Sequence, residues 1–145
     1  MIIRIIIVYE RMVKEMHRNS KKRNAILECL RQTDSHPNAE WVYSRLKPAF
    51  PDLSLATVYR NLRLLQEEGA IESLGAVCGQ ERFDGDTNPH SHAVCRVCGK
   101  VLDLPPAPLP EEWLQNAIGS AGFSLSACAV QLTSVCKECS AKEKQ

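Results

Sequence analysis

The chain has 145 residues, of which 44% are hydrophobic, and a length of this order allows one ordinary domain or two small ones without a large core. Its formal net charge is only +1, but the charge is unevenly distributed. Residues 1–80 contain 12 Lys and Arg against 9 Asp and Glu, while residues 81–145 contain 6 Lys and Arg against 8 Asp and Glu. This distribution permits a nucleic-acid-binding N-terminal half. The odd count of seven cysteines argues against a small secreted disulfide protein, so we expect a cytoplasmic location.

The N-terminal segment contains an apolar run, Ile2–Val8, that is interrupted by Arg4. This run is far shorter than the ~20 residues that a membrane span requires, and no small-residue cleavage site follows it. We expect an N-terminal arm or helix here and no membrane association. Met12 or Met16 could equally be the first residue of the chain.

Two short helices are predicted next. Residues 24–31 carry apolar side chains at helical spacing, with Ser20 upstream as the expected cap. After a polar break, Pro37 suits the first turn of a second helix, which continues one apolar stripe to Lys47. Both helices have a face that can be buried.

A third helix is predicted between Ser54, a good N-cap, and Gly69, a good terminator. Its apolar residues form one stripe and are expected to face inward. The polar residues are left to face outward: Thr57, Tyr59, Arg60, Asn61 and Arg63. Simple solvation of this polar face is the alternative explanation.

The segment Ala70–Phe83, with glycines at positions 75 and 79, reads as a β-hairpin. Three helices and a hairpin in this order are typical of a winged helix-turn-helix, whose third helix lies in the major groove of DNA. We expect Arg60 and Tyr59 to contact bases or phosphates, with Thr57 and Asn61 beside them, and Arg23 to serve the phosphate backbone.

The second half of the chain predicts strands over residues 90–94 and 100–104, a Pro-rich link, a helix over residues 111–121 and a long extended stretch over residues 123–135. Trp113 is expected to pack in a core. This order indicates a small α/β lobe whose open edge strand would suit dimerisation. The expected fold class is α+β, with a DNA-binding domain over residues 1–85 and a dimerisation and zinc-binding domain over residues 86–145.

Two Cys-x-x-Cys pairs are the strongest chemical signal in the sequence: Cys95 with Cys98, and Cys136 with Cys139. Each pair supplies two thiolates from one tight turn, and four thiolates suit a tetrahedral structural zinc. Two disulfides or four buried free thiols are the alternatives. Cys29 is expected to be a small core residue.

A second metal site is suggested by His90 and His92, which would share one face of a strand while Cys95 falls on the other. Nearby carboxylates that could complete the site are Asp84, Asp86 and Asp103, although two surface histidines are the plain alternative. A metallohydrolase also uses such ligands, but no general base or substrate loop is evident, so we expect no enzyme.

Four motifs together resemble the ferric-uptake-regulator (Fur) superfamily. They are Leu53–Leu65 (LSLATVYRNLRLL), Glu81–Asp84 (ERFD), the run from His90-x-His92 through Cys95-x-x-Cys98 to Asp103, and Cys136-x-x-Cys139. The match covers roughly residues 20–140, in the right order. The resemblance implies a homodimeric, metal-dependent repressor that binds a palindromic double-stranded DNA operator.

Within that family the chain is most like the peroxide-response (PerR) branch. The positions that match this branch's regulatory Fe(II) or Mn(II) ligands are His36, Asp84, His90, His92 and Asp103. Imidazoles and carboxylates without thiolates also suit these metals better than zinc. The iron-sensing branch commonly has Glu at the position of Asp103 and further His and Glu ligands that are missing from this chain.

The resemblance implies a mechanism in which the regulatory metal ties the two domains together and peroxide, acting at Fe(II), oxidises a ligand histidine at the position of His36 or His90. The clamp then opens and DNA is released. The four cysteines would hold a structural zinc. An iron- or zinc-responsive repressor of the same superfamily, without peroxide sensing, is the alternative.

Overall fold

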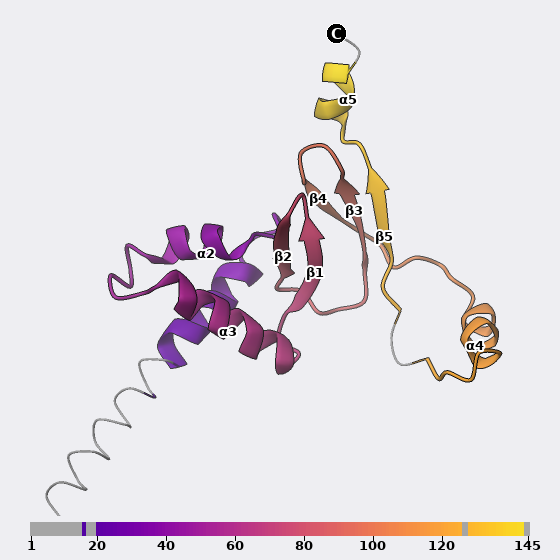
Figure 1. The fold of residues 1–145 in the computed structure, drawn as a ribbon, viewed down its shortest axis with the longest axis horizontal. Coiled ribbons are helices and arrows are strands. Elements are labelled where there is room, and N and C mark those ends of the chain that lie inside the picture. The colour runs from indigo at the N-terminus through magenta and orange to yellow at the C-terminus, as the bar shows by residue number, and fades with distance from the viewer. Residues whose placement is uncertain (1–15, 17–19, 126–127, 144–145) are drawn as a thin grey trace, which may run out of the picture. The chain divides into compact units, whose positions relative to one another are not determined.

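The structure is a computed structural model that describes residue 16, residues 20–125 and residues 128–143. The chain divides into two compact units, Met1–Thr87 and Asn88–Gln145 (Figure 1). Helices and strands occur together, which confirms the predicted α+β fold class. Within the described ranges, no helix is both long and apolar enough to cross a bilayer. The run Ile2–Val8, for which we predicted an arm or helix, lies outside the described residues.

Three helices and a hairpin build the first unit. Residues 20–31 are helical, and α2 (Ala39–Leu46) and α3 (Leu55–Glu67) follow. Because apolar residues recur every three or four positions, each helix presents one stripe to a shared core. The buried members of this core are Ile26, Cys29, Leu30, Ala39, Val42, Leu53, Val58, Leu62, Leu65, Ile71 and Phe83. Cys29 is thus a core residue, as predicted.

The helix starts differ in part from the predicted ones. Asn38 caps α2, because its side chain accepts a hydrogen bond from the amide of Trp41 at 2.8 Å. Pro37 therefore precedes the cap and does not occupy the first turn, so that prediction was wrong. Ser20 is itself helical and cannot be the cap that we predicted. The cap at Ser54 is confirmed by its bond from the Thr57 amide at 3.1 Å.

The wing is an antiparallel pair of strands, β1 (Glu72–Val77) and β2 (Gln80–Asp84), and it confirms the predicted hairpin. Val77 pairs with Gln80, so only Cys78 and Gly79 form the turn. Both have positive φ angles, of 50° and 81°. Two left-handed residues make a turn whose twist matches that of the flanking strands.

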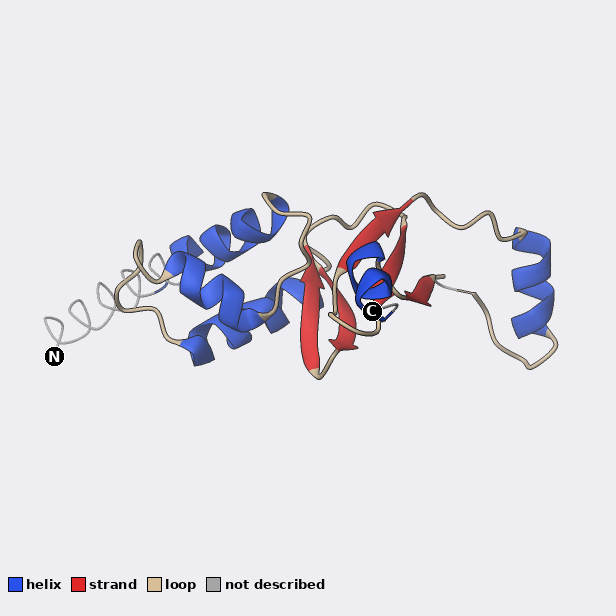
Figure 2. Ribbon diagram, turned by 90° about the horizontal axis from the view of Figure 1, so that it is seen from above, coloured by secondary structure: helices blue, strands red, loops and turns tan. Residues whose placement is uncertain are grey.

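The second unit contains a three-stranded sheet with the order β4–β3–β5, whose strands are labelled in Figure 1. Figure 2 shows the strands in red and the helices in blue. β3 (Ser91–Cys95) lies in the centre, antiparallel to β4 (Val101–Leu104) and parallel to β5 (Gln131–Ser134). The crossover to β5 contains α4 (Glu111–Gly119), and α5 (Lys137–Glu143) follows β5. The predicted order of strand, strand, helix and strand is confirmed, but α5 was not predicted.

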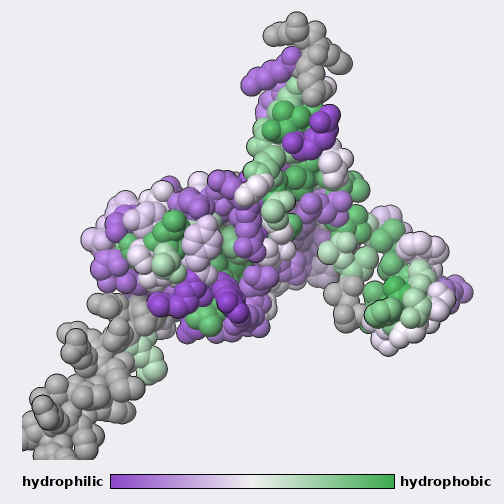
Figure 3. All heavy atoms as spheres, viewed as in Figure 1, coloured by the Kyte–Doolittle hydropathy of each residue, from purple (hydrophilic) through white to green (hydrophobic). Residues whose placement is uncertain are grey.

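Much apolar surface of the second unit is exposed in a single chain. α4 has no buried residue, and the side chain of Trp113 is 60% exposed. Apolar surface is visible over α4 in Figure 3. The prediction that Trp113 packs in a core was therefore wrong for one chain, because no described element of the unit covers α4. Leu102 on β4 and Leu132 on β5 are exposed as well.

Candidate metal centres and nucleic-acid interface

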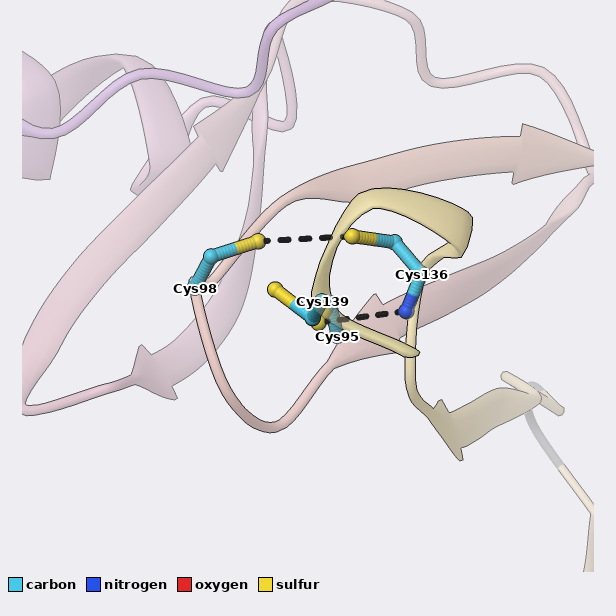
Figure 4. Close-up of side chains that lie close together, drawn as sticks. All are labelled: Cys95, Cys98, Cys136 and Cys139. Atoms are coloured by element: carbon cyan, nitrogen blue, oxygen red, sulfur yellow. Dashed lines mark hydrogen bonds between the residues drawn. The ribbon is translucent and has the colours of Figure 1, made fainter. Parts of the chain in front are cut away.

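The four paired cysteines converge in the second unit (Figure 4). Cys95 ends β3 and Cys98 lies in the turn that follows, while Cys136 and Cys139 lie just before and within α5. The parallel pairing of β3 with β5 places Ser134 beside Cys95, so the chain leaving β5 arrives at the first pair. The four sulfur atoms all lie within 4.8 Å of one another.

The geometry of this cluster fits a tetrahedral metal. Sγ of Cys98 lies 3.7 Å from Sγ of Cys136. Four sulfurs placed tetrahedrally at the usual zinc–sulfur distance are about 3.8 Å apart, whereas a disulfide needs about 2 Å. All four thiols are free. The cluster can therefore hold a zinc ion, and the disulfide alternative does not fit.

Hydrogen bonds shift the pKa values of the thiols in this cluster. The amide of Cys136 donates to Sγ of Cys95 at 3.3 Å, and with the amide of Cys98 it lowers the pKa of the Cys95 thiol to about 6. The hydrogen bond between Cys139 and Cys136 instead raises the pKa of the Cys139 thiol to about 12. One member of the set is thus a ready thiolate before a metal arrives, and others release protons when a metal binds.

An ion pair ties the two cysteine turns together. Lys100, which follows the first pair, lies 3.3 Å from the carboxylate of Glu138 inside the second pair. The hydrogen bond to Glu138 raises the pKa of Lys100, so this ammonium stays charged beside the thiolates.

The first unit brings together His36 and Asp84. Nε2 of His36 lies 3.3 Å from Oδ2 of Asp84, and both side chains are buried. Oδ1 of Asp84 accepts a hydrogen bond from the amide of Asp86 at 2.8 Å, which fixes the carboxylate at the end of β2. Asp86 itself is exposed and lies in the loop after β2. An imidazole and a carboxylate of this unit thus meet away from solvent.

The second unit brings together His90, His92 and Asp103. His92 pairs with Asp103 across β3 and β4, and His90 lies two residues before His92. Nε2 of each histidine lies 3.4 Å from Oδ1 of Asp103, and the two rings meet edge to face with centroids 4.4 Å apart. The Nδ1 atom of His90 lies 2.7 Å from the carbonyl oxygen of Asn88, which orients the ring. The sulfur cluster does not include these histidines, as the alternation along β3 predicted.

Both groups contribute side chains of the kind that could hold a metal ion. Each combines imidazole nitrogen with carboxylate oxygen and lacks thiolate, a donor set that suits Fe(II) or Mn(II). The convergence of Nε2 atoms on one carboxylate oxygen in the second unit is the arrangement of a chelating face. Two isolated surface histidines do not describe this geometry.

The exposed side of α3 carries the predicted DNA contacts. Tyr59, Arg60 and Arg63 face outward and line a groove with Gln66 on α3 and with Glu81 and Phe83 on the wing. The hydroxyl of Tyr59 donates to the carboxylate of Glu40 at 2.8 Å, and this hydrogen bond raises the pKa of Tyr59. Positive side chains beside a wing are suited to the DNA backbone and groove edges.

Three other predicted DNA residues have local partners. Asn61 is buried and donates to the carbonyl oxygen of Thr57 at 2.8 Å, so the prediction that it faces outward was wrong. The hydroxyl of Thr57 lies 2.8 Å from that of Ser54 at the helix cap. Arg23 lies 3.1 Å from Glu68, just beyond the end of α3.

Two further residues were missed by the sequence reasoning. Glu40 holds Tyr59, and Arg82 donates hydrogen bonds to the carbonyl oxygens of His36 and Ser35. The signal for Arg82 was available in part, because residues 82 and 84 lie on the same face of β2.

Comparisons with known proteins match most of the chain. The model of the Ferric uptake regulator family matches residues 14–133. The chain is 40% identical over 126 residues to a peroxide operon regulator of Bacillus subtilis (strain 168), a match that covers 87% of this chain and 86% of that protein.

Similar proteins with solved structures are also regulators of this kind. A peroxide stress regulator of Campylobacter jejuni has a TM-score of 0.75 and 29% identity, over 90% of this chain and 98% of that one. A ferric uptake regulator of Pseudomonas aeruginosa, solved with manganese, has a TM-score of 0.63 and 30% identity, over 80% of this chain and 87% of that one. The resemblance inferred from the four motifs is confirmed.

Proposed function

The chain belongs to the ferric uptake regulator family, and on this premise we propose that it is a dimeric, metal-dependent DNA-binding repressor that senses peroxide in the cytoplasm. Its matched relatives are named as regulators, in keeping with the expectation that the chain is not an enzyme. The observation that carries the proposal is the distribution of the ligands. His36 and Asp84 belong to the unit with the winged helix, and His90, His92 and Asp103 belong to the other.

We propose that one Fe(II) or Mn(II) ion takes all five side chains as ligands. Such an ion fixes the orientation of the winged-helix unit relative to the second unit. In a dimer, this orientation sets the distance between two α3 helices, which then match two half-sites of a palindrome. The buried pairing of His36 with Asp84 supports the proposal, because a preformed imidazole and carboxylate pair leaves little to reorganise on binding.

The sulfur cluster has a separate, structural role in this proposal. Zinc held by Cys95, Cys98, Cys136 and Cys139 joins the end of β3 to α5 and stabilises a unit with a small core. Coordination also protects the thiolates from oxidation, so peroxide is sensed elsewhere. A reducing compartment keeps these thiols available for the metal.

Dimerisation through the second unit accounts for its exposed apolar surface. Trp113 on α4, Leu102 on β4 and Leu132 on β5 are more than half exposed in one chain. A second copy of the chain that covers these side chains removes apolar area from water. The edge strands β4 and β5 are available to the same partner.

Peroxide sensing places the chemistry on a ligand histidine. When bound, Fe(II) supplies the redox chemistry that activates peroxide. The ring of His36 or His90 gains one oxygen atom, and the peroxide leaves as water. The oxidised ring is a poorer ligand, so the two units are released from their fixed orientation and the DNA affinity falls. Mn(II) maintains the same orientation without this reaction.

Mass spectrometry of the loaded protein tests this function. The zinc-containing dimer is loaded anaerobically with Fe(II) or with Mn(II) and treated with stoichiometric peroxide, and the peptides containing each histidine are weighed. We expect one added oxygen on the His36 or His90 peptide with Fe(II) only. His17, the one histidine outside the proposed ligand set, is the internal control and stays unmodified.

A second function in the same family is distinguished by the same experiment. The chain also resembles a ferric uptake regulator, so a repressor that responds to the metal level alone is the alternative. DNA binding that requires the metal, without histidine oxidation under Fe(II) and peroxide, would establish that alternative.

A further inference from the structure

Alternate residues of β2 all contact the segment that carries His36. Gln80 accepts a hydrogen bond from the Asn38 side chain at 2.6 Å, and Arg82 donates from Nη2 to the carbonyl oxygen of Ser35 at 3.1 Å. Nε of Arg82 donates to the carbonyl oxygen of His36, and the carboxylate of Asp84 meets the ring of His36. Side chains two residues apart share a face of a strand, so one face of β2 is dedicated to this segment.

The segment needs such support because of the backbone of His36. Its φ angle is +49°, in the left-handed region. A residue with a Cβ atom is disfavoured there, and such conformations persist only where the surroundings hold them. The side chain of His36 is nevertheless buried and directed at Asp84. A small change of this backbone would turn the imidazole away from the carboxylate.

We propose that Arg82 is a positioning residue for the regulatory metal: its guanidinium holds the carbonyl oxygens of Ser35 and His36 and thereby fixes the His36 ring in its ligand orientation. This inference rests on the proposed function, in which His36 is a ligand. Arg82 acts through His36 and does not touch the metal.

The chemistry of arginine suits this task. The guanidinium is planar and presents several N–H donors in a fixed fork, so one side chain can hold two successive carbonyl groups. Between them, these bonds fix the peptide unit on either side of the His36 Cα atom. The backbone amide of Phe83 donates a hydrogen bond to the carbonyl oxygen of Pro37 at 3.0 Å, so the segment stays attached to β2 when Arg82 is replaced. Loss of Arg82 is therefore expected to loosen His36 without detaching the segment.

A double-mutant cycle in the full-length, zinc-containing protein tests the inference. Mn(II) affinity is measured by electron paramagnetic resonance of free Mn(II) for the wild type, Arg82→Met, His36→Ala and the double variant. Arg82→Lys retains the charge with a single ammonium group. Gln80→Leu is the matched control, because it removes a contact on the same face of β2 that does not reach the two carbonyl groups. Circular dichroism and thermal unfolding without Mn(II) report on the fold.

We expect Arg82→Met to weaken Mn(II) binding by roughly tenfold or more, in the range for outer-sphere partners of metal ligands. Arg82→Lys should restore part of this loss, and Gln80→Leu should stay within about twofold of the wild type. The double variant should bind no more weakly than His36→Ala alone, because Arg82 acts only through that ligand.

Two results would overturn different conclusions. Full additivity of the two substitutions, or an Arg82→Met variant with unchanged Mn(II) affinity beside a weakened His36→Ala, rejects the role of Arg82. An unchanged Mn(II) affinity of His36→Ala rejects the proposed regulatory site itself. If Arg82→Met is unfolded without Mn(II), the double-mutant cycle is carried out with Arg82→Lys in place of Arg82→Met. Full additivity of Arg82→Lys and His36→Ala in Mn(II) affinity then rejects the role of Arg82.

Discussion

His92 on β3 faces Asp103 on β4 directly across the ladder, and Nε2 of His92 lies 3.4 Å from Oδ1 of that carboxylate. His90 approaches the same oxygen at 3.4 Å because it lies two residues away and on the same side of the chain. The register of two short strands therefore builds this part of the proposed regulatory site. A slip by one residue would move Asp103 to the opposite face.

Substitution Asp103→Asn tests the importance of this carboxylate. The amide has nearly the same shape but is neutral, so we expect the Mn(II) dissociation constant to rise by roughly 10–100-fold. Electron paramagnetic resonance of free Mn(II) measures it. Asp86→Asn is the matched control, because Asp86 is an exposed loop residue outside the proposed ligand set. Equal effects of the two substitutions would contradict a ligand role for Asp103.

Substitution Cys139→Ser tests the sulfur cluster. A serine hydroxyl is a poor zinc ligand, so we expect the purified protein to lose zinc and to unfold at a lower temperature. Elemental analysis and circular dichroism measure the two effects. Cys78→Ser, in the turn of the wing, removes an exposed thiol and should change neither. Full zinc content in Cys139→Ser would show that this thiol is dispensable.

The reactivity of Cys95 in the reduced, zinc-free protein should depend on pH in a defined way. Hydrogen bonds from the amides of Cys136 and Cys98 lower its pKa from 9.0 to about 6. Folding therefore favours the thiolate. This contribution to stability is complete above pH 9.0, decreases as the pH falls and is lost below about pH 6.

Pulse alkylation with iodoacetamide, followed by peptide mass spectrometry, measures this dependence. The alkylation rate of Cys95 should reach half of its maximum near pH 6. Cys139, whose pKa is raised to about 12, should be alkylated much more slowly at neutral pH. In denaturant both midpoints should approach 9.0, the ordinary value. Identical rates for the two thiols in the folded protein would contradict the hydrogen-bond pattern. Added zinc should protect both.

Several local signals in the sequence were reliable guides to the fold, although the predicted cap at Ser20 and the first-turn position of Pro37 were wrong. The Ser54 cap, the Gly69 terminator and the Cys-x-x-Cys turns depend on a few adjacent residues, and each is present where it was predicted. The prediction that Asn61 faces outward was wrong because the polarity of the residue was given more weight than its position in the helix. It lies three residues after Val58 and four before Leu65, which are both buried, so helical spacing alone places it inside.

Other features depend on contacts between distant segments and could not be read from local patterns. Arg82 is paired with carbonyl groups 46 and 47 residues earlier in the chain, and only the folded unit brings them together. Trp113 was predicted to lie in a core because tryptophan is highly buried on average, but it is 60% exposed and no described element of its own unit covers it.

Arg60→Ala and Asn61→Ala should separate DNA contact from helix stability. Arg60 is exposed, so its loss should weaken binding to a duplex selected from random DNA and reduce the salt slope of the affinity by about 1 if it neutralises one phosphate. Asn61→Ala removes a buried hydrogen bond and should lower the free energy of unfolding by about 1 kcal/mol with the salt slope unchanged. Fluorescence anisotropy and urea titration measure these effects. A reduced slope only in Asn61→Ala would reverse the two assignments.

Gly85→Ala should destabilise the first unit next to Asp84, one of the proposed ligands. A Cβ atom at position 85 would approach the amide nitrogen of Arg31 and the carbonyl carbon of Leu30 at 2.8 Å, and both atoms are backbone at the end of a helix. The loop or the helix must shift, at a cost of about 1–3 kcal/mol in the free energy of unfolding.

Gly119→Ala is the control, because nothing lies within 4 Å of the added atom and its φ angle is not left-handed. Urea denaturation without regulatory metal compares the variants, and equal midpoints for Gly85→Ala and the wild type would show that the contact relaxes freely. Since Asp84 immediately precedes the clash, the same shift should also weaken Mn(II) binding in Gly85→Ala but not in Gly119→Ala.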